Sequence, residues 1–200
     1  MRIKFLLFTL TLFLAQRAAL AQNSDLGFLA GVSGPGSDVV SGVNSYVHGS
    51  VEASGQINYA WQVFQHVVDL YVEMPLVISG RSDTTVTPTS VYSCNCTDVF
   101  FTPGLRVKIS PQSRVSFYGA LGGGLGSFGG FETTVGRGSV TTSTGRTNTA
   151  ALGFGGGLDF RLTRLLSLRV EGRDFVTRTG LGGTAGRNHS MFQVGIAFHF

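Results

Sequence analysis

The last nine residues of the chain, 192–200, alternate without a break between apolar side chains and small or polar ones. Successive side chains on a β-strand point to opposite faces of the sheet. The segment is therefore predicted to form a strand with one continuous apolar face. That face carries Phe192, Val194, Ile196, Phe198 and Phe200.

The same alternation recurs in seven earlier segments, so we expect eight strands in all. The clearest is segment 51–63, where Ile57 and Trp61 share a face opposite Gln56 and Asn58. The other segments are 26–33, 68–77, 99–109, 115–125, 152–162 and 166–173. After the first 21 residues, no apolar run is long enough for a membrane-spanning helix.

Short and long connections alternate between these segments. The short ones fall at 64–67, 111–113 and 163–165, and the long ones, rich in Gly, Ser and Thr, fall at 34–49, 79–97, 127–148 and 177–189. Short turns at one end and longer loops at the other are typical of outer-membrane β-barrels. A strand in hydrocarbon must pair on both edges, which requires a closed ring. The sequence thus predicts an all-β fold, an eight-stranded antiparallel transmembrane up-and-down β-barrel with four external loops.

The first 21 residues are predicted to be a signal peptide. Arg2 and Lys4 precede an apolar run at 5–15, and Ala19-Leu20-Ala21 forms a small-x-small cleavage site. The barrel domain is accordingly assigned to 22–200. Three of the 15 Lys+Arg residues lie in this leader, so the remainder nearly balances the 11 Asp+Glu residues. We expect no nucleic-acid partner, because no basic patch remains.

The eight segments, the turn Pro111-Gln112-Ser113 and the terminal run 194–200 resemble the small outer-membrane barrels of the OmpA/OmpX type, within the outer membrane protein β-barrel domain family. The resemblance covers essentially the whole chain after the leader. It implies location in the bacterial outer membrane, contact with outer-membrane lipid and lipopolysaccharide, and insertion by the barrel-assembly machinery. It also implies that the apolar residues of the last strand are the assembly signal. Unlike full-length OmpA, the chain is expected to carry no peptidoglycan-binding domain after Phe200.

If the apolar faces point outward to lipid, the polar faces line the lumen. A Lys or Arg on the lipid face costs about 2–4 kcal/mol near the bilayer centre, which favours this orientation. Five acidic and five basic side chains then face inward, which predicts a balanced ion-pair network that fills the lumen. The ten are Glu52, Asp69, Glu73, Arg106, Lys108, Asp159, Arg161, Arg169, Glu171 and Arg173. Asp174 falls on the lipid side and is expected at the external rim or at a bulge.

Two motifs could carry chemistry. Cys94 and Cys96 lie in an expected external loop of an exported protein, where thiols oxidise, so we expect a local or an intermolecular disulfide and no metal site. Small barrels that hydrolyse lipid A use a His/Ser pair separated by one residue, whereas His189 and Ser190 are adjacent. Adjacent strand residues point to opposite faces, so no catalytic residue is assigned.

These features favour a structural or surface-display protein with no enzyme activity and no cofactor. Its lumen would be plugged by the ion-pair network, and its four loops would face the environment. The alternative is a narrow pore for ions or small solutes, in which the lumenal pairs exchange partners. A lipid-A-modifying enzyme is a third hypothesis. The ligand of the external loops is not identified by the sequence.

Overall fold

A computed structural model describes residues 24–34, 46–86, 89–111, 113–136, 138–179 and 185–200. The predicted signal peptide, 1–21, lies outside these ranges, as do parts of the predicted loops at 34–49 and 177–189. Within the described ranges, no helix is long and apolar enough to cross a bilayer.

The described residues are almost entirely β-strand. The strands are β1 (Ser24–Ser33), β2 (Tyr46–Gly49), β3 (Glu52–Phe64), β4 (Val68–Val86), β5 (Ser90–Phe101), β6 (Gly104–Ile109), β7 (Val115–Gly136), β8 (Ser139–Arg161), β9 (Leu166–Thr179) and β10 (Ala185–His199).

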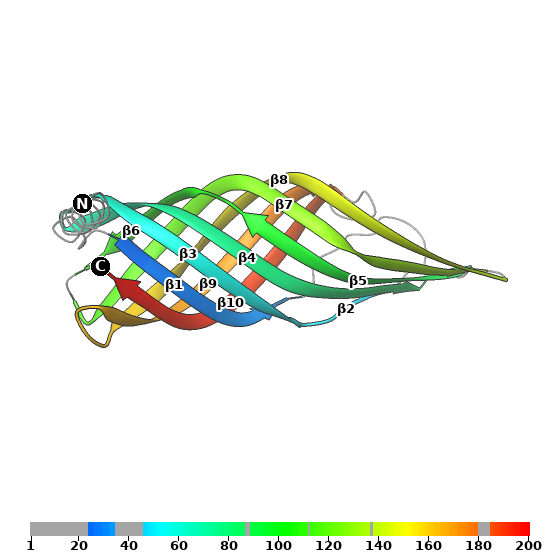
Figure 1. The fold of residues 1–200 in the computed structure, drawn as a ribbon, viewed down its shortest axis with the longest axis horizontal. Coiled ribbons are helices and arrows are strands. Elements are labelled where there is room, and N and C mark those ends of the chain that lie inside the picture. Colours follow the sequence, from blue (N-terminus) through cyan, green and yellow to red (C-terminus); the bar gives the residue numbers. More distant parts are fainter. Residues whose placement is uncertain (1–23, 35–45, 87–88, 112, 137, 180–184) are drawn as a thin grey trace, which may run out of the picture.

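Antiparallel pairing closes these strands into a ring. β1 pairs with β3 on one edge and with β10 on the other, and β9, β8 and β7 follow β10 in order. β5 and β6 each pair with both β4 and β7, so the two occupy one position in the ring. The ring therefore has eight positions, which confirms the fold predicted from the alternation. Figure 1 shows the strands running obliquely around the barrel.

The break between β5 and β6 has a clear cause in the sequence. Pro103 has no backbone N–H to donate to a neighbouring strand. Its carbonyl instead accepts a hydrogen bond from the Gly123 backbone N–H at 3.1 Å. The strands approach so closely here that a Cβ on Gly122 would lie 2.3 Å from the Thr102 carbonyl oxygen. Glycine is the residue that fits this approach.

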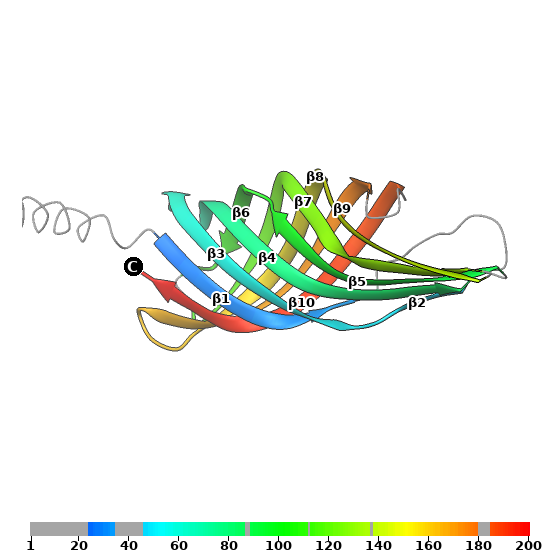
Figure 2. The same ribbon diagram turned by 45° about the vertical axis from the view of Figure 1, so that its right-hand side comes forward.

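Two of the four predicted loops are strands instead. Residues 79–86 and 90–97 belong to β4 and β5, and residues 127–136 and 139–148 belong to β7 and β8. The two hairpins project well beyond the closed part of the barrel (Figures 1 and 2). Both faces of the outer hairpin segments carry polar or β-branched residues, so they have no apolar alternation to reveal them. β2 adds to this projecting sheet by pairing Tyr46–Gly49 with the end of β4.

The two faces of the wall are oriented as the sequence predicts. Ile57 is 49% exposed and Phe198 is 40% exposed on the outside, whereas Arg169 and Glu73 are completely buried inside. Exposed apolar side chains of this kind are found on each of the eight ring positions. The molecule therefore has an apolar outer belt around a charged interior.

The two ends of the barrel sequence meet at one end of the ring. Ser24 and Phe200 exchange two backbone hydrogen bonds of 2.9 Å, which continue the β1–β10 pairing to its limit. On the outer face, the rings of Phe28 and Phe198 pack edge to face at 6.4 Å. The last strand is thus the one that closes the ring against the first.

Candidate functional site in the barrel lumen

Eight buried charged side chains form one continuous chain of ion pairs in the lumen. Four are acidic and four are basic, so the chain carries no net formal charge. In order along the chain they are Lys108, Asp159, Arg169, Asp25, Arg106, Glu73, Arg173 and Glu171. Each acid except Glu171 lies between two bases.

The first half of this chain lies near the short-turn end of the barrel. Lys108 Nζ lies 2.6 Å from Asp159 Oδ2, and Arg169 Nε lies 2.7 Å from Asp159 Oδ1. Arg169 Nη2 then reaches Asp25 Oδ2 at 2.9 Å. Arg169 therefore joins a carboxylate of β8 to a carboxylate of β1.

The second half crosses to the middle of the barrel. Arg106 Nη1 lies 2.9 Å from Asp25 Oδ2, and Arg106 Nη2 lies 2.8 Å from Glu73 Oε2. Arg173 then links the other oxygen of Glu73, at 2.9 Å, to Glu171 Oε1, at 2.6 Å. Each arginine contacts two carboxylates, an arrangement that the fork of the guanidinium group permits.

Neutral side chains add hydrogen bonds to this chain. Tyr118 donates its hydroxyl hydrogen to Glu171 Oε2 at 2.5 Å, and Gln56 donates to Glu171 Oε1 at 3.1 Å. The Tyr118 ring lies 4.8 Å from the guanidinium carbon of Arg106 and 5.2 Å from that of Arg169. A cation over an aromatic face is stabilised by the ring quadrupole, so Tyr118 supports both arginines.

An apolar layer lies next to the charged chain on its external side. Its members are Val77, Phe100, Phe128, Ala151, Phe175 and Met191. Phe100 stacks on Phe175 with ring centroids 4.4 Å apart and meets Phe128 edge to face at 5.6 Å. Val77 and Phe100 are paired in register, and Val77 follows Glu73 by four residues toward the projecting hairpins. All three phenylalanine side chains are completely buried.

His189 and Asp98 extend this layer with a polar pair. His189 Nδ1 lies 3.4 Å from Asp98 Oδ2, and its ring stacks on Phe128 at 5.2 Å. Arg81 approaches the same Asp98 oxygen at 3.5 Å. The lumen therefore changes along its length from ion pairs to aromatic rings and then to a small charged cluster.

Comparisons with known proteins agree with this geometry at the level of the fold. No protein-family model and no curated protein sequence matches the chain. Among solved structures, the chain is similar to Neisserial surface protein A, with a TM-score of 0.52, 12% identity, and coverage of 88% of this chain and 97% of that one. It is also similar to the outer membrane protein OprG from Pseudomonas aeruginosa, with a TM-score of 0.54, 12% identity, and coverage of 90% and 96%.

The chain has the fold of a small OmpA/OmpX-like outer-membrane β-barrel. A closed antiparallel ring with an apolar outer belt satisfies every requirement for crossing a bilayer with strands. OprG, which has this fold, is an outer membrane protein, and single-chain barrels of this type are found in the bacterial outer membrane.

Seven of the ten charged residues expected in the lumen are members of the ion-pair chain, and three are not. Glu52 is half-buried and accepts a hydrogen bond from Ser50 at 2.5 Å. Asp69 is buried, but its bonds come from the Tyr71 hydroxyl and from the backbone N–H of His66.

Arg161 is the clearest correction among the predicted lumenal residues. It is exposed, and it donates a hydrogen bond to the carbonyl of Pro111. Arg161 is the last residue of β8, where the strand leaves the ring, so its side chain turns toward the neighbouring short turn. At the end of a strand, the alternation of side chains no longer determines whether a residue is buried.

Asp25 is a member of the chain that the sequence prediction omitted. It is 1% exposed and pairs with two arginines. The alternation of the first segment could have predicted this position, because Asp25 directly precedes the outward-facing Leu26 and so belongs to the inward face. The apolar layer was harder to find. Phe100 lies between Val99 and Phe101, and a run of apolar residues does not reveal which face is which.

The two motifs considered for chemistry lie as follows. His189 is buried in the lumen, while Ser190 is exposed on the outer wall, so the two side chains do not meet. Cys96 is buried and disulfide-bonded, and the side chain of Cys94 lies outside the described residues.

Asp174 is half-buried on the outer face of an uninterrupted part of β9, where it is paired in register with Ser190. The alternative that Asp174 lies at a bulge is therefore wrong.

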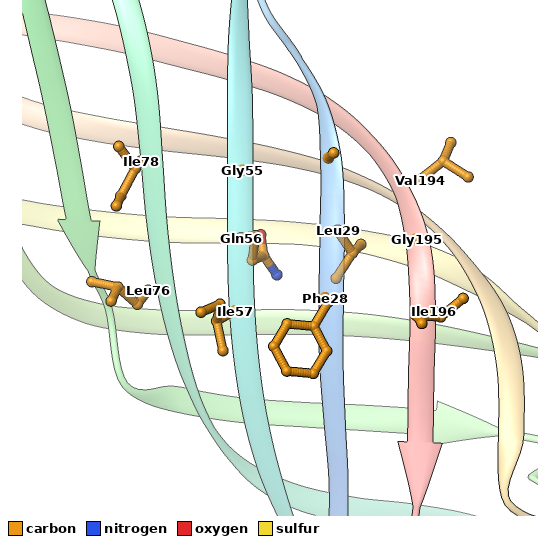
Figure 3. Close-up of a pocket in the computed structure, with 11 residues that line it drawn as sticks. Phe28, Leu29, Gly55, Gln56, Ile57, Leu76, Ile78, Val194, Gly195 and Ile196 are labelled. Carbon is orange, nitrogen blue, oxygen red and sulfur yellow. The ribbon is translucent and has the colours of Figure 1, made fainter.

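The outer wall has a shallow apolar depression across β10, β1, β3 and β4. It has a volume of about 490 Å³ and lies where Gly55 and Ala30 leave space between larger side chains. Figure 3 shows Phe28, Ile57 and Ile78 around Gly55. Gln56, which also borders this space, is 3% exposed and hydrogen-bonds Glu171 on the lumenal side. The depression therefore belongs to the lipid-facing belt.

Proposed function

We propose that this OmpA/OmpX-like barrel is a closed anchor that displays a β-sheet at the bacterial surface, with no enzyme activity. The observation that carries the proposal is the filling of the lumen. Eight paired charges occupy one part of it, and three buried phenylalanine rings occupy the next. A solute would have to break ion pairs and also displace an apolar layer, two different kinds of barrier in series.

The projecting hairpins support the display role. β7 and β8 pair with each other as far as Gly136 and Ser139, and β4 and β5 pair as far as Val86 and Val91. These lengths exceed what the apolar belt requires. β8 pairs with β9 only from Ala151 onward, so among described residues its outer part pairs with β7 alone.

A strand with one free edge offers unpaired backbone N–H and C=O groups. Such an edge is a template to which an extended segment of another protein can add. The outer part of β8 is exposed over residues 139–146 and is rich in threonine and serine. We therefore propose that an extracellular partner would bind to this displayed sheet by strand addition.

Conductance of the folded protein in planar lipid bilayers tests the closed anchor. We expect no steady openings in the wild-type protein. Steady openings that disappear in the Arg106→Glu variant would instead support the narrow pore for ions or small solutes. An Arg106→Lys variant, which keeps the charge, separates a loss of conductance from a loss of folding.

Labelling of intact cells tests the display. A cysteine introduced by Thr142→Cys, near the tip of the β7–β8 hairpin, should react with a membrane-impermeant maleimide. A cysteine introduced by Thr163→Cys, in the short turn at the opposite end, should react only after the cells are opened. Equal labelling of both in intact cells would contradict the proposed orientation, and the wild-type protein provides the background.

A further inference from the structure

The disulfide bond of Cys96 lies in the projecting sheet, on β5. Cys96 is disulfide-bonded and 2% exposed. The chain has two cysteines, so the partner that one chain can offer is Cys94, two residues earlier on the same strand. A disulfide stabilises a fold mainly by restricting the unfolded chain, and it does so least when the closed loop is shortest. A bond within one strand, which joins no separate elements, therefore contributes little to holding the sheet together.

The pairing of β5 opposes so small a ring. Residues two apart on a strand have Cα atoms about 6.5 Å apart, whereas a relaxed disulfide brings its two Cβ atoms to about 3.8 Å. Residues 93–97 of β5 keep an unbroken register with β4 on one side and β7 on the other, which holds the strand extended. A disulfide whose geometry conflicts with its surroundings is reduced more readily than an ordinary structural one.

Arg81 supplies a positive charge beside Cys96. The two residues are paired in register between β4 and β5, and both are buried. Arg81 Nε lies 3.5 Å from Asp98 Oδ2, an oxygen that His189 also approaches at 3.4 Å. At these distances Asp98 offsets only part of the Arg81 charge. A nearby guanidinium stabilises a thiolate, and a stabilised thiolate leaves a disulfide faster. Cys96 is therefore suited to be the leaving sulfur.

β7 shields the sulfur of Cys96 from direct attack. Gly130 of β7 is paired in register with Cys96, and a Cβ on Gly130 would lie 2.8 Å from Cys96 Sγ. The same Cβ would lie 2.5 Å from the Asn95 carbonyl oxygen, so the two strands are in close contact here. A thiol has no approach to a sulfur enclosed in this way. Attack must therefore fall on the other sulfur of the bond, that of Cys94.

We infer that the disulfide between Cys94 and Cys96 is a thiol–disulfide exchange site for a low-molecular-weight thiol. The thiolate of the small molecule attacks Cys94 Sγ, the S–S bond breaks, and its electron pair leaves on Cys96 Sγ as a thiolate beside Arg81. A second small thiol then attacks the mixed disulfide and releases Cys94. In the net reaction two thiols are oxidised to one disulfide, and the two cysteines receive the two electrons and the two protons.

A redox titration of the full folded barrel in detergent micelles tests the exchange. The protein is equilibrated with glutathione buffers of rising reduced fraction, quenched with acid and alkylated, and its free thiols are counted by mass spectrometry. We expect half-reduction within the range of these buffers, in which structural disulfides of secreted proteins stay oxidised. A bond that survives in reduced glutathione alone would overturn the inference, as would a disulfide-linked dimer on a non-reducing gel.

Single-cysteine variants test which sulfur is attacked. Cys96→Ser retains Cys94, and Cys94→Ser retains the enclosed Cys96. With oxidised glutathione as the probe, we expect Cys96→Ser to form a mixed disulfide about tenfold faster or more, because access and thiolate character determine the rate. The thermal gel shift checks that both variants are folded. Equal or reversed rates would overturn the assignment of Cys96 as the leaving sulfur.

Two substitutions of Arg81 test its role as a positioning residue for the leaving thiolate. Arg81→Gln should slow reduction by glutathione about threefold or more, because a less stabilised thiolate leaves more slowly. Arg81→Lys keeps the charge and should restore most of the rate. Arg146→Gln is the matched control, since Arg146 is exposed on the outer face of the same sheet.

An unchanged rate in Arg81→Gln, or a loss that Arg81→Lys does not rescue, would contradict electrostatic assistance by Arg81. The exchange goes beyond the proposed function, because none of these measurements depends on whether the lumen conducts or on what binds the edge of β8.

Discussion

At the scale of single residues, the lumen is organised around arginines that each hold two carboxylates. Arg169 is the clearest case, because it makes two hydrogen bonds to Asp159 and one to Asp25 while completely buried. Bringing a charge out of water is costly, and only its partners compensate for it. Loss of one member therefore leaves the others buried and unpaired, so the chain acts as a unit.

Replacing Arg169 with alanine is expected to lower the free energy of unfolding by about 3–5 kcal/mol, the usual effect of breaking a buried pair. Urea titration of the folded barrel in lipid vesicles measures this change. Arg161→Ala is the control, since Arg161 is exposed and should contribute less than about 1 kcal/mol. Equal losses in the two variants would show that burial of the pairs does not determine their contribution.

At the scale of strands, close approach between neighbours depends on particular glycines. A Cβ on Gly195 of β10 would lie 1.9 Å from the carbonyl oxygen of Phe28 on β1. Gly172 of β9 has open space at the corresponding position, with no atom within 4 Å. The alternation places Gly195 on the lumenal face and Gly172 on the lipid-facing side, and the two also differ in what surrounds them.

We expect Gly195→Ala to destabilise the barrel by about 1–3 kcal/mol, because backbone must shift to admit the methyl group. Gly172→Ala should leave stability unchanged. The temperature at which the folded band converts to the unfolded band on a gel compares the two variants directly. A stable Gly195→Ala barrel would mean that β1 and β10 can separate slightly without loss of pairing.

The success of the sequence prediction also varies by strand. Where one face meets lipid and the other meets charges, as in segment 51–63, alternation located the strand and its orientation correctly. It failed in the outer parts of β7 and β8, because residues such as Thr134 and Thr141 meet water on both faces and need no alternation. It also failed at Phe100, because the interior there is apolar and the two faces look alike. Alternation of apolar and polar residues appears in the sequence only where the two faces of a strand meet different environments. Where both faces meet water, or both meet apolar side chains, the alternation is absent.

At the scale of the whole molecule, the barrel and its projecting sheet are joined by continuous strands but serve different needs. The ion pairs and the apolar layer lie within the closed ring. The β7–β8 hairpin projects beyond this ring (Figure 2). The barrel should therefore tolerate changes at the tip that would be damaging within the ring.

Replacing residues 133–142 by a two-residue Asn-Gly turn is expected to preserve the folded barrel, since Glu132 and Ser143 are already paired in register and such a turn connects paired strands. The thermal gel shift should change little, whereas reactivity of the shortened tip toward large surface probes should fall. Failure of the shortened chain to fold would show that the hairpin contributes to assembly as well as to display.

The place of Asp25 in the first strand has a consequence for how the protein is made. This carboxylate bridges Arg106 of β6 and Arg169 of β9, which come from opposite parts of the ring. An open, partly inserted ribbon would leave both arginines short of a counter-ion. Sealing the seam between the first and last strands therefore also completes the pairing of both arginines, so we expect ring closure and neutralisation of this part of the interior to occur together.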